Sequence, residues 1–116
     1  MLSTERNYLP IKFRYMIIQI NTDKHITVHE AYNEKLNHMV SSELKRFSTQ
    51  ITRLELFLSD EKGIHKGVDE KKCALEARIA GRKPIAVSDT GNSYDFAVKG
   101  ALLKMKSLLD GSVGRK

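Results

Sequence analysis

The feature that most constrains the fold is an alternation of apolar and polar residues in two successive stretches, 51–59 and 72–79. A period of two is typical of half-buried β-strands, which are apolar on one side and polar on the other. After the second stretch, Gly81–Pro84 predicts a turn, and a third strand-like run begins at Ile85. The pattern therefore predicts three consecutive strands in an antiparallel meander. The positions predicted to face the core are Leu54, Leu56, Leu58, Cys73, Leu75, Ala77 and Ile79.

The segment before the meander predicts a strand and then a helix. Ile17–Asn21 is a short strand-like run. From Val28 to Phe47, apolar residues recur every three or four positions, which is the spacing of an amphipathic helix. Thr27–Glu30 has the Ser/Thr-x-x-Glu form of a capping box, so the helix is expected to begin there and to end near Phe47.

The segment after the meander predicts a second helix. Asn92 or Ser93 can accept hydrogen bonds from its first amides, and Gly111 is expected to end it. Between them, apolar residues recur at i, i+3 and i+4, which predicts one buried stripe. The positions of this stripe are Tyr94, Ala97, Val98, Ala101, Leu102, Met105, Leu108 and Leu109.

The predicted order is strand, helix, three strands, helix. This order favours an α+β fold in which both helices pack on one face of a four-stranded sheet. Periodicity does not show which meander strand pairs with the first strand. The other face of the sheet is expected to stay more open and to carry Arg53, Phe57, Glu76 and Arg78.

The length of 116 residues fits one domain with a substantial core. Residues 1–15 have no clear period, and Met16 stands directly before the first strand. We therefore expect an N-terminal extension at 1–15, one domain at 16–110 and a short tail at 111–116. The extension is either a stretch upstream of a natural start at Met16 or a basic arm that touches a phosphate backbone.

The composition argues against membrane and secreted classes. No apolar run approaches the roughly 20 residues that span a bilayer, and no signal peptide is evident. The single Cys73 cannot form an internal disulfide, which favours a reducing, cytoplasmic location. Because Cys73 falls on the inward side of a predicted strand, we interpret it as a core residue rather than a nucleophile.

The motifs of enzymes and metal sites are missing. The sequence has no Gly-rich phosphate loop, CxxC pair, HExxH motif or nucleophile elbow. The acids between Asp60 and Lys71 lack the spacing of a calcium loop and alternate with lysines. We therefore predict a protein that is not an enzyme and has no cofactor, metal or small-molecule substrate. The four histidines, which are scattered, are His25, His29, His38 and His65.

The charge favours a polyanionic partner. Lys and Arg number 20 against 14 acidic residues, which gives a net charge of +6. A small basic domain attracts nucleic acid, although solubility alone would also account for the charge. The cations that we predict to bind RNA are Lys35, Lys45, Arg46, Arg53, Arg78, Arg82, Lys83, Lys99, Lys104 and Lys106.

Several strings, in this order and spacing, resemble the ribosome hibernation promoting factor family, which includes the ribosome-associated inhibitor called protein Y. They are IQINTDKHI, RFSTQITRLELFLSDEKG, KKCALEARIAGRKPIAVSDTGNSYDFAV and ALLKMKSLL. The likeness covers Met16 to about Leu109 and is greatest to the short members of the family.

The resemblance implies a β-α-β-β-β-α fold of the double-stranded-RNA-binding-domain type. It also implies binding to the small ribosomal subunit and its rRNA, in the channel between head and body. There the domain would overlap the places of transfer and messenger RNA and stall translation in stationary or starved cells. Arg46 and Lys104 match basic positions of the family's two helices.

The sequence departs from the family pattern at three places. Glu43 stands where many members have lysine, Ser107 stands where many have arginine, and the basic tail is reduced to Arg115 and Lys116. These departures leave an alternative open, in which the chain keeps the fold as a protein-interaction module but has lost strong rRNA binding.

Overall fold

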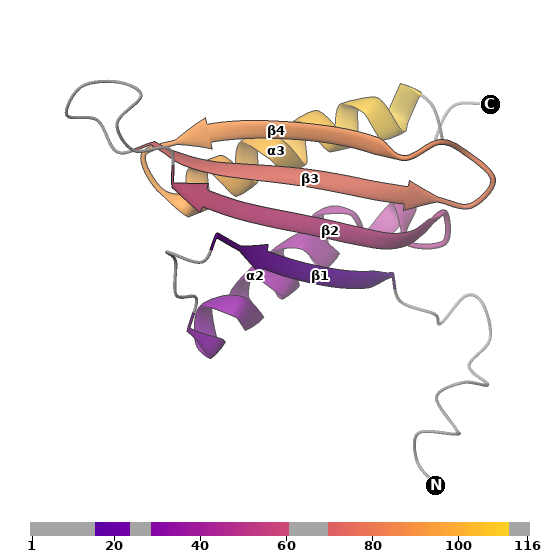
Figure 1. The fold of residues 1–116 in the computed structure, drawn as a ribbon. Coiled ribbons are helices and arrows are strands. Elements are labelled where there is room, and N and C mark those ends of the chain that lie inside the picture. Colours follow the sequence, from indigo (N-terminus) through magenta and orange to yellow (C-terminus); the bar gives the residue numbers. More distant parts are fainter. Residues whose placement is uncertain (1–15, 24–28, 61–69, 112–116) are drawn as a thin grey trace, which may run out of the picture.

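The computed structural model describes residues 16–23, 29–60 and 70–111, which form two layers. Both helices lie on the same face of a four-stranded sheet, and the other face is uncovered by any described element (Figure 1). The predicted α+β fold and its element order are therefore confirmed. The elements are β1 (Ile17–Thr22), α2 (Glu30–Glu43), the 3-10 turn η2 (Lys45–Phe47), β2 (Ile51–Asp60), β3 (Lys71–Ile79), β4 (Ile85–Gly91) and α3 (Tyr94–Leu109).

The sheet has the strand order β1-β2-β3-β4. The pairs β2–β3 and β3–β4 are antiparallel, as the meander predicted. The first strand pairs in parallel with β2, from Ile17 opposite Arg53 to Thr22 opposite Leu58. A parallel pair needs a long crossover between its strands, and α2 lies within that crossover. This pairing settles the question that periodicity left open.

A bulge interrupts the regular alternation at the start of β2. Ile51 pairs with Ile79, but Arg53 pairs with Arg78, so Thr52 is an extra residue in this strand. As a result Ile51 and Leu54, three positions apart, are both buried. A strict period of two would have placed them on opposite faces.

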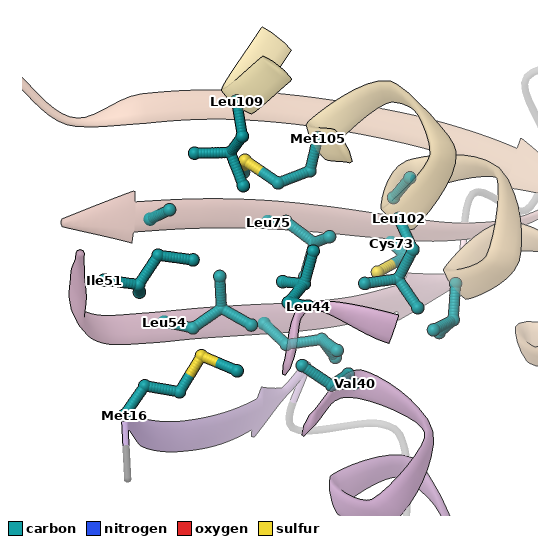
Figure 2. Packing of buried hydrophobic residues seen from close by; sticks show 14 of the residues in the cluster. Met16, Val40, Leu44, Ile51, Leu54, Cys73, Leu75, Leu102, Met105 and Leu109 are labelled. Atoms are coloured by element: carbon teal, nitrogen blue, oxygen red, sulfur yellow. The ribbon is translucent and has the colours of Figure 1, made fainter. Parts of the chain in front are cut away.

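The core lies between the sheet and the two helices. In Figure 2, Met105 and Leu109 of α3 lie between β3 and β4, whereas Val40 of α2 and Leu44, which directly follows α2, lie towards β1 and β2. The seven strand positions predicted to face the core are all buried. Met16, which directly precedes β1, is also buried.

The helix ends agree with the sequence in part. Ser93 caps α3, because its Oγ accepts a hydrogen bond from the amide of Phe96 at 3.2 Å. The N-cap of α2 is His29, whose side chain makes no capping hydrogen bond, and Thr27 of the predicted capping box lies outside the described residues. The first helix continues beyond Glu43 only as the 3-10 turn η2.

One residue of the predicted stripe on α3 is not in the core. Leu108 is 47% exposed, whereas the next residue, Leu109, is fully buried. Tyr94 is partly buried against the core, and the remaining six positions of the predicted stripe are buried. The predicted extension (1–15) and most of the tail (112–116) lie outside the described residues. Neither described helix has the length and apolar character that crossing a bilayer requires.

Candidate nucleic-acid interface

The outer side of the helix layer carries several of the predicted RNA-binding cations. They form ion pairs that join the segment α2–η2 to α3 and its C-cap residue. The partners are 60 to 64 positions apart in the sequence, so only folding brings them together. These side chains are 30–59% exposed. The three pairs are Lys35 Nζ with Asp95 Oδ2 at 2.9 Å, Lys106 Nζ with Glu43 Oε1 at 3.0 Å, and Arg46 Nη2 with Asp110 Oδ1 at 2.7 Å.

An open pocket of about 500 Å³ lies beside two of these pairs. We call it the inter-helix pocket. Its cations come from the turn η2 and from the last turn of α3, and the end of α2 adds a serine and a glutamate. Its lining residues are Ser42, Glu43, Lys45, Arg46 and Lys106.

The turn η2 positions Arg46 at this pocket. Phe47, the next residue, is buried in the core and fixes the turn from inside. The guanidinium carbon of Arg46 lies 4.4 Å from the centre of the Phe47 ring, which is cation–π distance. Arg46 is therefore oriented on a buried anchor while its charged end faces the pocket.

At the other end of the helix layer, Asp95 joins α3 to α2. Tyr32 Oη donates to Asp95 Oδ1 at 2.8 Å, and Lys35 Nζ donates to Oδ2. The hydrogen bond from Lys35, followed by that from Tyr32, holds the pKa of Asp95 below its ordinary value. Burial, and then the hydrogen bond to Asp95, raises the pKa of Tyr32. This contact is a structural clasp between the helices, and it occupies both oxygens of the carboxylate.

Exposed ion pairs of this kind stabilise a fold by only about 0–1 kcal/mol each. A phosphate offers the same cations hydrogen bonds as strong as those of a carboxylate, and an arginine can bind it through two N–H groups. The cations of the helix layer can therefore exchange their carboxylate partners for RNA phosphates at small cost to the fold.

The ten predicted cations do not form one surface. Lys35, Lys45, Arg46, Lys99 and Lys106 lie on the helix layer, and Lys99 is exposed on α3. The remaining five lie on the border of α3 next to β4, on the open face of the sheet, or in the turn between β3 and β4.

Lys104 is on the opposite border of α3 from Lys106. Its Nζ donates to the carbonyl oxygen of Ser88 at 2.8 Å and lies 3.6 Å from Asp89 Oδ1, so it joins α3 to β4. Arg53 of β2 and Arg78 of β3 are opposite each other in the strand register, and both lie on the open face of the sheet. On that face, Arg53 donates to Glu55 Oε2 at 3.1 Å and also to Gln19 Oε1. Exposed Arg82 and Lys83 lie in the turn between β3 and β4.

The charge of the described residues is nearly balanced. They include 12 of the 20 lysines and arginines but 11 of the 14 acids, which leaves a net charge of +1. The remaining five positive charges of the net +6 belong to residues outside the described ranges. The net charge of the whole sequence thus overstates how positive the described surface is.

Among the described residues, no three His, Cys, Asp or Glu side chains come together as metal ligands. Cys73 is fully buried, and burial raises the pKa of its thiol to about 12. The interpretation of Cys73 as a core residue is confirmed. His25 and His65 lie outside the described residues.

Sequence reasoning missed two groups of residues at this surface. Asp95 and Asp110 were not recognised as partners of the cations on α2 and η2, because no local pattern signals a contact over 60 or more positions. Phe96 and Leu103 are exposed on α3. A helical-wheel view could have found them, since both fall opposite the apolar stripe.

Comparison with known proteins identifies the fold. No family model and no curated protein matches the sequence. Among solved structures, a ribosomal subunit interface protein from Coxiella burnetii matches with a TM-score of 0.64 and 16% identity, over 86% of this chain and 100% of that one. The N-terminal domain of Protein Y from Thermus thermophilus matches with a TM-score of 0.63 and 13% identity, over 81% of this chain and 96% of that one. The resemblance predicted from the sequence is thus confirmed at the level of the fold: this chain has the fold of the ribosomal subunit interface protein and of the Protein Y N-terminal domain.

Proposed function

We propose that this protein is a non-catalytic factor of the ribosome hibernation family, which binds the small ribosomal subunit and inhibits translation. The observation that carries the proposal is the shared fold, which covers most of this chain and nearly all of both solved structures. The strings that resemble the family support it independently. On this proposal the protein is cytoplasmic and acts in stationary or stressed cells.

The helix layer is the proposed rRNA-binding surface. It has cations from α2, η2 and α3 on one side of the molecule, and the inter-helix pocket lies among them. Ribosomal RNA presents phosphates and 2′-hydroxyls on a fixed surface, which Lys and Arg can contact without reading base sequence. Arg53 and Arg78 lie on the opposite face of the sheet, so we do not include them in this surface.

Inhibition would follow from occupancy. The sheet and the core hold the two helices in fixed positions, so the domain is a rigid body rather than a flexible basic peptide. Such a body, once seated in the channel between head and body of the subunit, would exclude messenger and transfer RNA without any chemical step.

The acids of the helix layer would moderate this binding. To contact a phosphate, Lys106 and Arg46 must leave Glu43 and Asp110, and the carboxylates then remain close to the incoming phosphate. Like charges at such short range repel each other. Affinity is therefore expected to be strongest at low salt and weaker than that of a surface without these acids.

Co-sedimentation with purified small subunits at low salt tests the proposal. Wild-type protein should sediment with the subunits, whereas the double variant Arg46→Glu, Lys106→Glu should remain largely in the supernatant. The double variant Arg78→Glu, Lys83→Glu is the matched control, since it reverses two charges on exposed residues away from the helix layer. Circular dichroism should show all three proteins folded. Wild-type protein that never sediments with small subunits would refute the proposal.

A second candidate is a protein-interaction module with the same fold, and the near-balanced charge of the described residues favours it. A pull-down from lysate with and without nuclease separates the two functions. A contact that depends on RNA is lost after nuclease treatment, whereas a protein partner is retained.

A further inference from the structure

Two large apolar side chains project from the outer side of α3. Phe96 is 65% exposed and Leu103 is 66% exposed, the highest values among the large hydrophobic residues of the described ranges. They are seven positions apart, so they lie on the same face of the helix, about 10 Å from each other along its axis. The fold gives them no partner in the core.

The backbone around Phe96 is tightly held. Its amide donates to Ser93 Oγ in the helix cap. The end of β4 also packs against it, because a Cβ built on Gly91 would lie only 2.9 Å from Phe96 Cβ. The ring of Phe96 is therefore presented from a fixed point of the fold.

An exposed cation lies next to Phe96 on the outer side of α3. Lys99 is exposed and follows Phe96 by three positions, which places it on the adjacent part of the same face. The nearest acid in the sequence, Asp95, already accepts hydrogen bonds from Tyr32 and Lys35. An exposed aromatic ring next to a cation is the arrangement that single-stranded nucleic acid binds, by stacking of a base and contact to its phosphate.

We propose that Phe96 stacks on an unpaired base of ribosomal RNA, with Lys99 contacting a neighbouring phosphate. This inference rests on the proposed function and adds a contact that is not electrostatic to a surface whose charge is nearly balanced. A protein partner is less well suited, since the apolar area consists of two separate side chains rather than a continuous patch of several hundred Å².

The Phe96→Trp variant provides a direct readout, because the sequence contains no other tryptophan. Its fluorescence should be quenched when small subunits are added and also, independently of the ribosome, when single-stranded oligo(A) is added. Phe96→Ala should bind small subunits about 5- to 150-fold more weakly, which corresponds to the usual loss of one stacked base.

Two controls separate aromatic stacking from other effects. Leu103→Ala removes an equally exposed apolar side chain from the same helix face, and Phe57→Ala removes an exposed ring from the open face of the sheet. Both should bind within about twofold of wild type.

The other possible outcomes of these experiments overturn either the inference about Phe96 or the proposed function. Wild-type affinity of Phe96→Ala, or Phe96→Trp that binds without quenching, overturns the inference while the proposed function stands. Equal losses in Leu103→Ala and Phe96→Ala indicate an apolar protein contact instead and also overturn it. If wild type does not bind small subunits, the proposed function fails, and the oligo(A) titration still decides whether the ring stacks on bases.

Discussion

Burial decides how individual side chains of this protein react and titrate. Cys73 lies in β3 with none of its surface exposed, and its pKa is raised to about 12 by burial and secondly by the charge of Asp89. At neutral pH the thiol is therefore protonated and inaccessible, and it serves as a small apolar residue.

Thiol labelling tests this assignment. We expect Cys73 in the native protein to resist a thiol-specific reagent at pH 8 for far longer than a free cysteine, and to react at once in denaturant. The ratio of the two labelling rates is the measurement. Stoichiometric labelling of the native protein within minutes would show that the thiol is accessible.

The clasp at Asp95 predicts a dependence of stability on pH. Its pKa in the folded state is lowered from an ordinary value of 3.8, mainly by the hydrogen bond from Lys35. The stabilisation is therefore complete well above that value and is lost as the pH falls through the lower, folded-state pKa. Asp95→Asn should thus lose less stability than wild type between pH 5 and pH 3. Urea unfolding of both proteins at the two pH values measures this, and equal losses would contradict the account.

At the residue scale, the sequence predicted burial better than it predicted partners. The alternation in β2 and β3 identified Cys73 and Leu56 as inward positions, because burial follows the local period. It could not identify Asp110 as the partner of Arg46, since that contact depends on how two helices are placed by the sheet.

Among the elements, β2 is central to the fold, with β1 on one side and β3 on the other. Leu56 lies in the middle of β2, faces the helices and has none of its surface exposed. Leu56→Ala should lower the free energy of unfolding by about 2–5 kcal/mol, because it leaves a cavity that the core cannot fully close. Phe57 is the next residue and lies on the open face, so Phe57→Ala should lower the free energy of unfolding clearly less than Leu56→Ala does. Chemical denaturation of both variants checks the difference, and equal costs would mean that the two faces are not distinct.

The close packing of β4 against α3 at Gly91 predicts the effect of a second substitution. Gly91 ends β4, and a Cβ there would lie 2.9 Å from Phe96 Cβ and 3.2 Å from the amide nitrogen of Ala97. Gly91→Ala should therefore destabilise the protein by about 1–3 kcal/mol, the usual cost of overpacking. Gly111→Ala is the control, because a Cβ at Gly111 meets nothing within 4 Å. Thermal unfolding of the two variants should show a lower midpoint for Gly91→Ala alone.

At this scale, the sequence predicted which elements form but not how all of them connect. The pattern from 51 to 79 specified β2 and β3, because their alternation and polar connections leave few alternatives. The parallel pairing of β1 with β2 and the bulge at Thr52 depend on tertiary packing, which a local period does not describe.

For the whole molecule, the distribution of charge matters more than its total. The net charge of +6 predicted a polyanionic partner, but the described residues have a net charge of only +1. What the fold adds is placement, because it gathers Lys45, Arg46 and Lys106 at one pocket. We therefore expect RNA affinity to depend on these few cations rather than on net charge.

The salt dependence of binding to purified small subunits tests this most directly. The logarithm of the association constant of the wild-type protein should fall linearly with the logarithm of salt concentration, because phosphate contacts release counterions. In the double variant Arg46→Gln, Lys106→Gln the slope should be shallower by about 1.5 to 2, which corresponds to two lost phosphate contacts. A double variant with the slope and affinity of the wild type would contradict the claim that the helix layer binds ribosomal phosphates.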